Sequence, residues 1–228
     1  LSTYPDGHIY ALPAIDENQN IRVDKILYIN QSYLDKLGMD MPATLDEFGE
    51  YLRQATSRDL NGDGKNEYGL SFEALQNAPS IYTYLFGLFG VSWDTRSYMH
   101  SEEGTTQLQF APAMEETRKA LEYFHEWYEE GLLDPENFTQ SSTQLKAKAK
   151  TEGVAASVVF WYLDLNDGDE SMNEYRVMNL PEGPDGNQVW RRNGLIPGYV
   201  GNQFFITSAN EHPAETLAFI DWWMDNSE

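Results

Sequence analysis

Short apolar segments alternate with amphipathic helices along the chain, and this alternation most constrains the fold. An alternation of strands and helices is typical of an α/β protein. Strands are predicted at residues 8–12, 25–30, 68–72, 154–161, 175–180 and 203–208. Helices are predicted at residues 31–37, 42–55, 79–90, 112–131, 142–153 and 214–226.

Local signals mark several helix boundaries. Asn30 is a good N-cap for the first helix, and Thr44 with Glu47 has the spacing of a capping box. The longest helix is expected to end at Gly131. Its predicted apolar face consists of Met114, Leu121, Phe124, Trp127 and Tyr128. Trp222 and Trp223, on the last helix, are predicted to lie in a core or at an interface between lobes.

Composition excludes several classes of function. The 228 residues carry a formal net charge of −22 and contain no cysteine. Such an acidic chain is unsuited to binding nucleic acid or an anionic membrane, because phosphate recognition needs Lys and Arg. The lack of cysteine removes disulfides, zinc-thiolate sites and thiol nucleophiles. No apolar run approaches the roughly 18 residues of a membrane span.

The segment "RDLNGDGKNEYG" at residues 58–69 places oxygen-bearing side chains at every second position around two glycines. Lys65 follows these glycines as in the end of a phosphate-binding loop. However, Asn66 stands where that motif needs Ser or Thr, and Asp63 would repel the phosphates. A phosphate-binding function is therefore disfavoured.

The same segment predicts a structural calcium site, because a hard cation takes oxygen ligands from alternate positions of a tight turn. The predicted ligands are Asp59, Asn61, Asp63, the backbone carbonyl of Lys65, and Glu67. Leu70 occupies the twelfth position, where an EF-hand has a bidentate glutamate, so Glu67 would have to close the coordination shell. A polar turn without a metal is the alternative.

Signals for an enzyme are weak. A glycosidase needs two carboxylates flanking one bond, but among 37 acidic residues some pair is always available. His125-Glu126 begins like a zinc-protease motif, yet position 129 is Glu rather than His. No G-x-S-x-G motif is present. A binding protein is therefore favoured over a glycoside-processing enzyme, and a carbohydrate-interaction module without a transport role is a further alternative.

The order of several segments resembles the family 1 extracellular solute-binding proteins, which are sugar-binding lipoproteins of ABC importers. These segments are "DGHIYALP", "LYINQSYLDKLGMDMPATLDEF", "DLNGDGKNEYGLSF", "GVAASVVFW", "YRVMNLPEGPDG" and "HPAETLAFIDWWM". The resemblance covers almost the whole chain and is strongest to the branch that includes alginate-binding proteins and LipO-like lipoproteins. In that branch the loop between helix and strand holds a calcium ion.

The resemblance implies the periplasmic-binding-protein type II fold, in which two α/β lobes close on a sugar. It implies that the chain is an internal fragment consisting mainly of the second lobe. Residues 1–24 would be a crossing segment at the edge of the first lobe. Residues 25–153 would form the second-lobe domain with the calcium loop 59–67, and residues 154–228 the crossing strands and a return helix.

The resemblance also implies a function outside the cytoplasm. The protein is expected to capture a sugar or oligosaccharide and deliver it to the membrane permease of an ABC importer. It is expected to be a monomer without enzymatic activity, anchored to the membrane as a lipoprotein in its full-length form.

Aromatic side chains are the predicted sugar contacts, because a pyranose ring has an apolar face that stacks on them. By resemblance, Trp161, Tyr162 and Trp93 would face the cleft. Trp190 and Tyr199 flank a glycine-containing, loop-like stretch and are further candidates. The alternative is that these side chains belong to the core.

Overall fold

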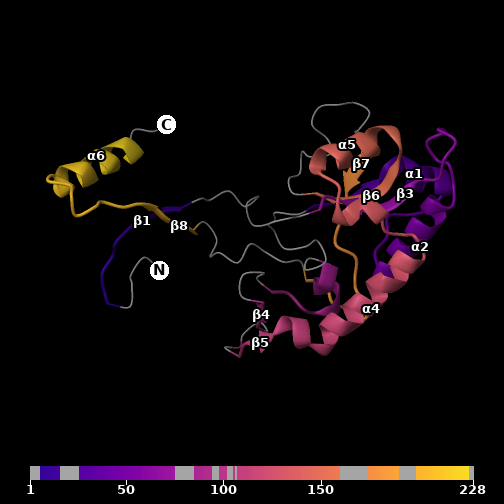
Figure 1. Cartoon of the computed structure of the whole chain (residues 1–228), viewed down its shortest axis with the longest axis horizontal. Helices are drawn as coiled ribbons and strands as arrows, with labels where there is room; N and C mark the ends of the chain where they lie inside the picture. Colours follow the sequence, from indigo (N-terminus) through magenta and orange to yellow (C-terminus); the bar gives the residue numbers. More distant parts are fainter. Residues whose placement is uncertain are drawn as a thin grey trace. The chain divides into compact units, whose positions relative to one another are not determined.

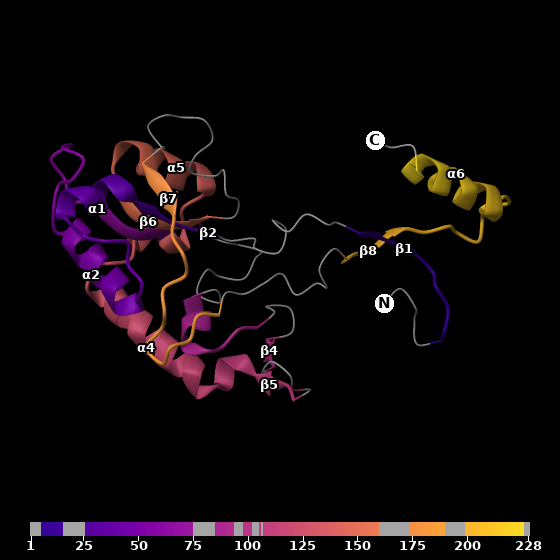
Figure 2. The same cartoon turned by 180° about the vertical axis from the view of Figure 1, so that it is seen from behind.

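The chain divides into two compact units, which are described separately (Figures 1 and 2). The larger unit is Val23–Asn193, and the smaller unit combines Leu1–Arg22 with Gly194–Glu228. The computed structural model describes residues 6–15, 26–74, 85–93, 98–101, 105, 107–159, 174–189 and 199–225.

A mixed four-stranded sheet with the order β3-β6-β2-β7 forms the centre of the larger unit. β3 (Tyr68–Phe72) runs parallel to β6 (Val154–Val159). β2 (Ile26–Asn30) is antiparallel to β6 and to β7 (Tyr175–Val177). All residues of β6 are buried, as expected for a central strand covered on both faces. The strands expected at 25–30 and 68–72 are confirmed, whereas the one expected at 175–180 ends at Val177.

Two short helices follow β2, and their start signals confirm the predictions. α1 (Gln31–Leu37) begins at Asn30, whose side chain accepts a backbone N–H of the first turn. α2 (Leu45–Thr56) begins at Thr44, which forms the predicted capping box with Glu47. These caps satisfy N–H groups that have no partner inside a helix.

The region between β3 and β6 contains the remaining elements of the larger unit. They are η2 (Phe86–Phe89), β4 (Met99–His100), β5 (Gln109–Phe110), η3 (Ala111–Ala113), α4 (Glu115–Glu129), η4 (Pro135–Phe138) and α5 (Ser142–Thr151). The described part of the helix expected at 79–90 is mainly the single 3-10 turn η2, and residues 79–84 lie outside the described residues. α4 begins later than expected because η3 precedes it and Met114 is extended.

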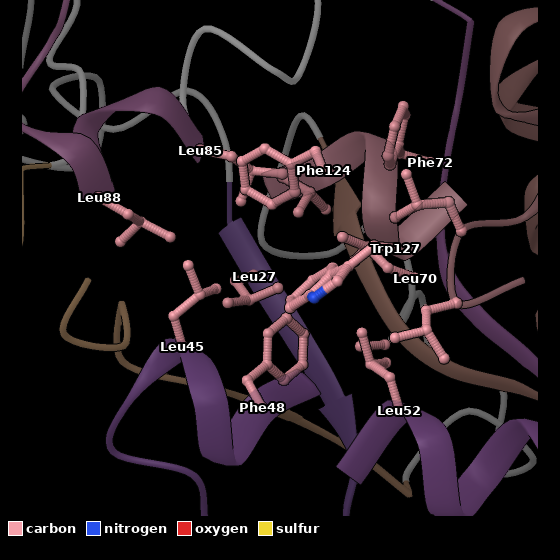
Figure 3. Packing of buried hydrophobic residues seen from close by; sticks show 14 of the residues in the cluster. Leu27, Leu45, Phe48, Leu52, Leu70, Phe72, Leu85, Leu88, Phe124 and Trp127 are labelled. Carbon is pink, nitrogen blue, oxygen red and sulfur yellow. The ribbon is translucent and has the colours of Figure 1, made fainter. Parts of the chain in front are cut away.

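The main hydrophobic core lies between the sheet, α2 and α4. The Trp127 ring of α4 is centred 5.4 Å from the Phe124 ring and 5.8 Å from the Phe48 ring of α2. Figure 3 shows Trp127 among these rings and the leucine side chains that surround them. Leu27 faces this core, whereas its neighbour Tyr28 faces a smaller cluster with α5, because side chains alternate along a strand.

The apolar face predicted for α4 is too wide. Its buried residues are Thr117, Ala120, Phe124 and Trp127. Leu121 and Tyr128 are 54% and 47% exposed, which corrects their assignment to the core. At about 100° per residue, these two side chains fall on the flank of the buried stripe.

The smaller unit contains a two-stranded ribbon and one helix. β1 (Leu12–Ile15) pairs antiparallel with β8 (Tyr199–Phe204), with an irregular register between Leu12 and Ala14. The expectation that Pro13 stops the first strand is wrong, since β1 continues through it. An irregular position suits proline, which has no N–H to donate to the ladder. β8 begins earlier than the strand expected at 203–208.

α6 (Pro213–Asp225) has no buried side chain among the described residues. Trp222 and Trp223 are 61% and 57% exposed. The expectation that both belong to a core is therefore not met within the described part of the chain, and their place at an interface between lobes stays a prediction.

Candidate functional site

The loop at residues 59–67 lies at one edge of the sheet, between α2 and β3. β3 and β6 begin at this edge and β2 ends there, since Ile29 pairs with Ala156 and Tyr68 pairs with Val154. α1 starts from the end of β2 and passes beside the loop (Figure 1), where the Lys36 ammonium donates a hydrogen bond to the Leu60 carbonyl.

Side-chain oxygens of the loop accept hydrogen bonds from its own backbone. The two Asp59 carboxylate oxygens accept from the N–H groups of Gly62 at 2.6 Å and Gly64 at 2.9 Å. Asn61 and Asp63 accept from the amides two residues further along, each at 2.8 Å. Both glycines have left-handed backbones, with φ of 85° and 89°, which residues with a Cβ rarely adopt. The loop is therefore compact and ordered by local bonds.

Glu67 differs from the other predicted ligands because it is buried, with only 4% of its surface exposed. Its Oε1 accepts hydrogen bonds from the N–H groups of Leu60 at 2.6 Å and Asn61 at 2.8 Å. Its Oε2 accepts from the Tyr33 hydroxyl of α1 at 3.2 Å. Burial raises the pKa of Glu67, although these hydrogen bonds partly oppose the rise.

Gly153, in the turn between α5 and β6, makes room for the Glu67 carboxylate. A Cβ at this position would lie 1.6 Å from Glu67 Oε2 and 2.7 Å from the Tyr33 hydroxyl. The backbone is also left-handed here, with a φ of 81°. Neither Tyr33 nor Gly153 was predicted from the sequence to belong to the site. A glycine between a helix and a buried strand was visible, but the side chain that it accommodates was not.

The donor set of this loop fits a hard cation in its chemistry. Asp59, Asn61, Asp63, Lys65 and Glu67 can offer carboxylate, amide and carbonyl oxygens, the ligand types that calcium takes. Among the described residues, no three Asp, Glu or His side chains converge so that they could hold a metal by themselves. A calcium ion would therefore depend on the amide and carbonyl oxygens in addition to the acids.

An ion cluster with a buried Lys148–Asp134 pair lies beside Tyr68, the residue that follows the loop, and was not predicted. Lys148 of α5 donates to Asp134 at 2.6 Å and to Glu136 at 2.9 Å, and its ammonium lies 4.2 Å from the Tyr68 ring centre. Burial alone would lower the pKa of Lys148, but the two carboxylates outweigh it and raise the pKa. The sequence showed only a basic amphipathic helix, whereas the fold pairs one of its lysines internally.

Most of the predicted sugar contacts fall outside the described residues. Trp161, Tyr162 and Trp190 lie there, and Tyr199 lies in β8 with its side chain not described. Trp93 is described and is only 7% exposed, within the main core and with its ring centred 5.5 Å from that of Phe86. Its indole N–H has no hydrogen-bond partner among the described residues. Of the predicted sugar contacts, only the Trp93 side chain is described, and the role of the others stays a prediction.

Solved structures that share this fold include two proteins described with bound or recognised sugars. The chain superposes on FusA of Streptococcus pneumoniae in complex with kestose, with a TM-score of 0.78, 24% identity, and coverage of 97% of this chain and 45% of FusA. It superposes on an HMO-binding solute-binding protein of Bifidobacterium longum infantis with a TM-score of 0.80, 20% identity, and coverage of 98% and 47%. These similarities identify the fold as that of type II periplasmic binding proteins, of whose length this chain covers less than half.

A further solved FusA structure is described as an EF-hand mutant in complex with fructo-nystose, with a TM-score of 0.76, 24% identity, and coverage of 97% of this chain and 45% of that chain. That description concerns FusA itself.

No helix within the described ranges has both the length and the apolar character to cross a membrane.

Two curated proteins are similar to this chain in sequence. The fructooligosaccharide ABC transporter substrate-binding protein FusA is 29% identical over 97% of this chain and 41% of its own length. Lipoprotein LipO of Bacillus subtilis is 24% identical over 86% of this chain and 39% of its own length. The chain thus spans less than half of these relatives. Residues 4–227 match the bacterial extracellular solute-binding proteins, and the chain belongs to this family.

Proposed function

We propose that the protein captures an oligosaccharide outside the cytoplasm and delivers it to the membrane permease of an ABC importer. The observation that carries this proposal is the family match over residues 4–227. The relative FusA, whose name assigns fructooligosaccharides to it, supports an oligosaccharide as the ligand class. LipO, a lipoprotein by name, supports membrane anchoring of the full-length protein. The family consists of binding proteins, so no catalytic step is assigned.

In this function the lobes provide the surfaces that contact the sugar, and binding of the sugar drives the lobes to close. Two lobes that close on one ligand bury it by a hinge motion. Since the chain spans 41% of FusA, it would provide only part of the contact surface of such a site. Weak sugar binding is therefore expected for the 228-residue chain.

Calorimetry with an oligosaccharide panel tests this function. The panel contains kestose, nystose, maltotriose and a human milk oligosaccharide, and each mixture is analysed afterwards by chromatography. Binding heat without any hydrolysis product is expected for at least one sugar. Product formation would indicate a glycoside-processing enzyme instead. No heat with any sugar, from a sample whose melting is cooperative, would contradict sugar capture by this part of the protein.

Two tryptophan variants separate sugar contacts from core residues. In the full-length protein, Trp161→Ala should weaken sugar binding and change the melting temperature little, because stacking is lost without a core cavity. Truncation of a central aromatic contact typically costs on the order of 2 kcal/mol of binding energy. Trp93→Ala should instead lower the melting temperature, since Trp93 is buried against Phe86. The reverse pattern would exchange the two assignments.

We also propose that the loop at 59–67 binds one structural calcium ion. The alternating oxygen donors and the left-handed glycines support it, as does the EF-hand mutation described for FusA. The ligands would be Asp59, Asn61, Asp63, the Lys65 carbonyl and Glu67. A bound divalent cation would supply positive charge that screens the repulsion among three carboxylates. The chain's own part is to hold these oxygens in place, through the backbone bonds of the loop and the burial of Glu67.

A further inference from the structure

The Glu67 side chain is a buried contact between the loop and the rest of the larger unit. Asp59, Asn61 and Asp63 are exposed, and their side chains accept hydrogen bonds from backbone N–H groups of the loop. Glu67 is buried and contacts both α1, through Tyr33, and the turn at Gly153. These two residues lie 34 positions before and 86 positions after it in the sequence. Only the fold brings the three together.

We propose that Tyr33 and Gly153 are positioning residues for the calcium loop, which together hold the Glu67 carboxylate in the orientation that the ion requires. This inference rests on the proposed calcium site. Tyr33 acts by donating its hydroxyl to Oε2, and Gly153 acts by leaving space where any Cβ would displace the same oxygen.

The hydrogen-bond capacity of the carboxylate shows why a positioning group matters. Oε1 already accepts two backbone N–H groups, so its two lone pairs are occupied. Oε2 accepts one hydrogen bond and keeps one lone pair for another partner. The Tyr33 hydroxyl therefore determines how the oxygen with remaining capacity is oriented. Without it, the carboxylate would gain rotational freedom that calcium binding must remove again.

The surroundings of the Tyr33 hydroxyl restrict its position. Tyr33 is 3% exposed, and α1 is held at its start by the Asn30 cap. An ordinary tyrosine hydroxyl, with a pKa of about 10, keeps its proton at neutral pH, so Tyr33 can donate it to Oε2. A neutral donor beside a buried carboxylate is an outer-shell arrangement that orients a metal ligand.

Tyr33→Phe is the direct test, and Tyr51→Phe is its matched control. Tyr51 is also buried, and its hydroxyl donates to the Asn30 carbonyl at 3.2 Å and the Ala155 carbonyl at 2.9 Å, two acceptors outside the loop. Calcium affinity is measured by calorimetry, and melting in a chelator reports the fold without metal. Tyr33→Phe should weaken calcium binding about tenfold, at the lower end for outer-shell partners of metal ligands. Tyr51→Phe should lower the chelator melting temperature but leave the calcium Kd within about twofold of wild type.

Gly153→Ala and Gly131→Ala provide a second matched pair. Both glycines are left-handed, with φ of 81° and 74°, so both substitutions impose a similar backbone strain. A Cβ at Gly131 meets no atom within 4 Å, whereas one at Gly153 overlaps Glu67. Gly153→Ala should therefore reduce calcium affinity at least as much as Tyr33→Phe, and Gly131→Ala should not.

The outcomes distinguish this inference from the calcium site itself. If the wild-type chain binds no calcium, both are overturned. If wild type binds calcium and either Tyr33→Phe or Gly153→Ala binds it equally or more tightly, only the positioning role is overturned. Weakened binding in these two variants, with wild-type affinity in Tyr51→Phe and Gly131→Ala, supports it.

Discussion

The helices α4 and α6 are both rich in aromatic residues, yet they have opposite surroundings. Phe124 and Trp127 of α4 are 3% and 2% exposed. Phe219 and Trp223 of α6 are 56% and 57% exposed. α4 packs against η2 and α2 in the larger unit, while the described part of the smaller unit contains only the β1–β8 ribbon and α6.

This difference shows that an apolar face becomes a core only where other elements oppose it. A two-stranded ribbon with one helix has little surface with which to bury aromatic rings. The smaller unit has an apolar hollow of about 330 Å³, whose lining residues are Ile9, Tyr10, Ala11, Leu12, Phe204, Phe205, Ile206 and Leu217. The larger unit should therefore determine the stability of the chain, and the following experiments test that asymmetry.

The largest effect is expected for Trp127→Ala. The indole lies between Phe48 and Phe124, so its removal leaves a cavity in the main core. The free energy of unfolding should fall by about 3–5 kcal/mol in urea denaturation. Trp223→Ala in α6 is the control and should change it by less than about 0.5 kcal/mol. Equal losses in the two variants would show that α6 is packed as firmly as α4.

Lys148→Ala should have the next largest effect, because it leaves Asp134 charged and buried without its cation. We expect a loss of about 3 kcal/mol, the lower end for a broken buried pair, since Ser71 and Gln140 still donate to Asp134. Lys119→Ala, on the exposed side of α4, is the control and should be nearly neutral. A neutral Lys148→Ala would show that the cluster contributes no net stability.

The same cluster predicts a pH dependence. The pKa of Lys148 is raised in the folded chain, so its contribution is complete below the ordinary lysine pKa of about 10.4. It is lost as the pH rises through the higher folded value. Alkaline melting curves of wild type should therefore fall more steeply than those of Lys148→Ala. Parallel curves would contradict the pairing.

Calcium should stabilise the larger unit by an amount between the effect expected for Lys148→Ala and that expected for polar substitutions in α6. A ligand that binds only the native state adds about 2.7 kcal/mol at a concentration 100 times its Kd. Hydrogen exchange should slow in the loop at 59–67 and in α1, because Glu67 connects them through Tyr33. Exchange in α6 should not change, since it belongs to the other unit. An unchanged melting temperature with calcium and with a chelator would argue against the ion.

The smallest effect on stability is expected from polar substitutions in α6. A triple variant, Leu217→Gln with Phe219→Gln and Trp223→Gln, removes three side chains that are 47%, 56% and 57% exposed. The unfolding free energy should change by less than about 0.5 kcal/mol per site. Binding of a hydrophobic dye and self-association at high concentration should both decrease, because exposed apolar surface drives them. A large loss of stability would mean that this face is packed in solution.

Several elements could be predicted because their signals are local. The Asn30 cap and the Thr44–Glu47 capping box depend on residues within one helical turn, and both are present. β2 and β3 were also placed within one residue of their bounds. The width of the α4 face could not be predicted, since Leu121 is apolar and is excluded only by what stands opposite the helix. η2 was expected as a helix because its apolar residues suit either form.

In the candidate site, the spacing of the oxygen donors from Asp59 to Glu67 and of the glycines between them follows from the local sequence. Alternating ligands in a tight turn are a property of nine consecutive residues. Tertiary structure alone decided that Glu67 is buried, and that Tyr33 and Gly153 meet it. It also decided that Lys148 is paired internally while Trp223 is exposed. The physical reason is that burial and pairing depend on atoms contributed by strands and helices distant in sequence, and no local pattern contains them.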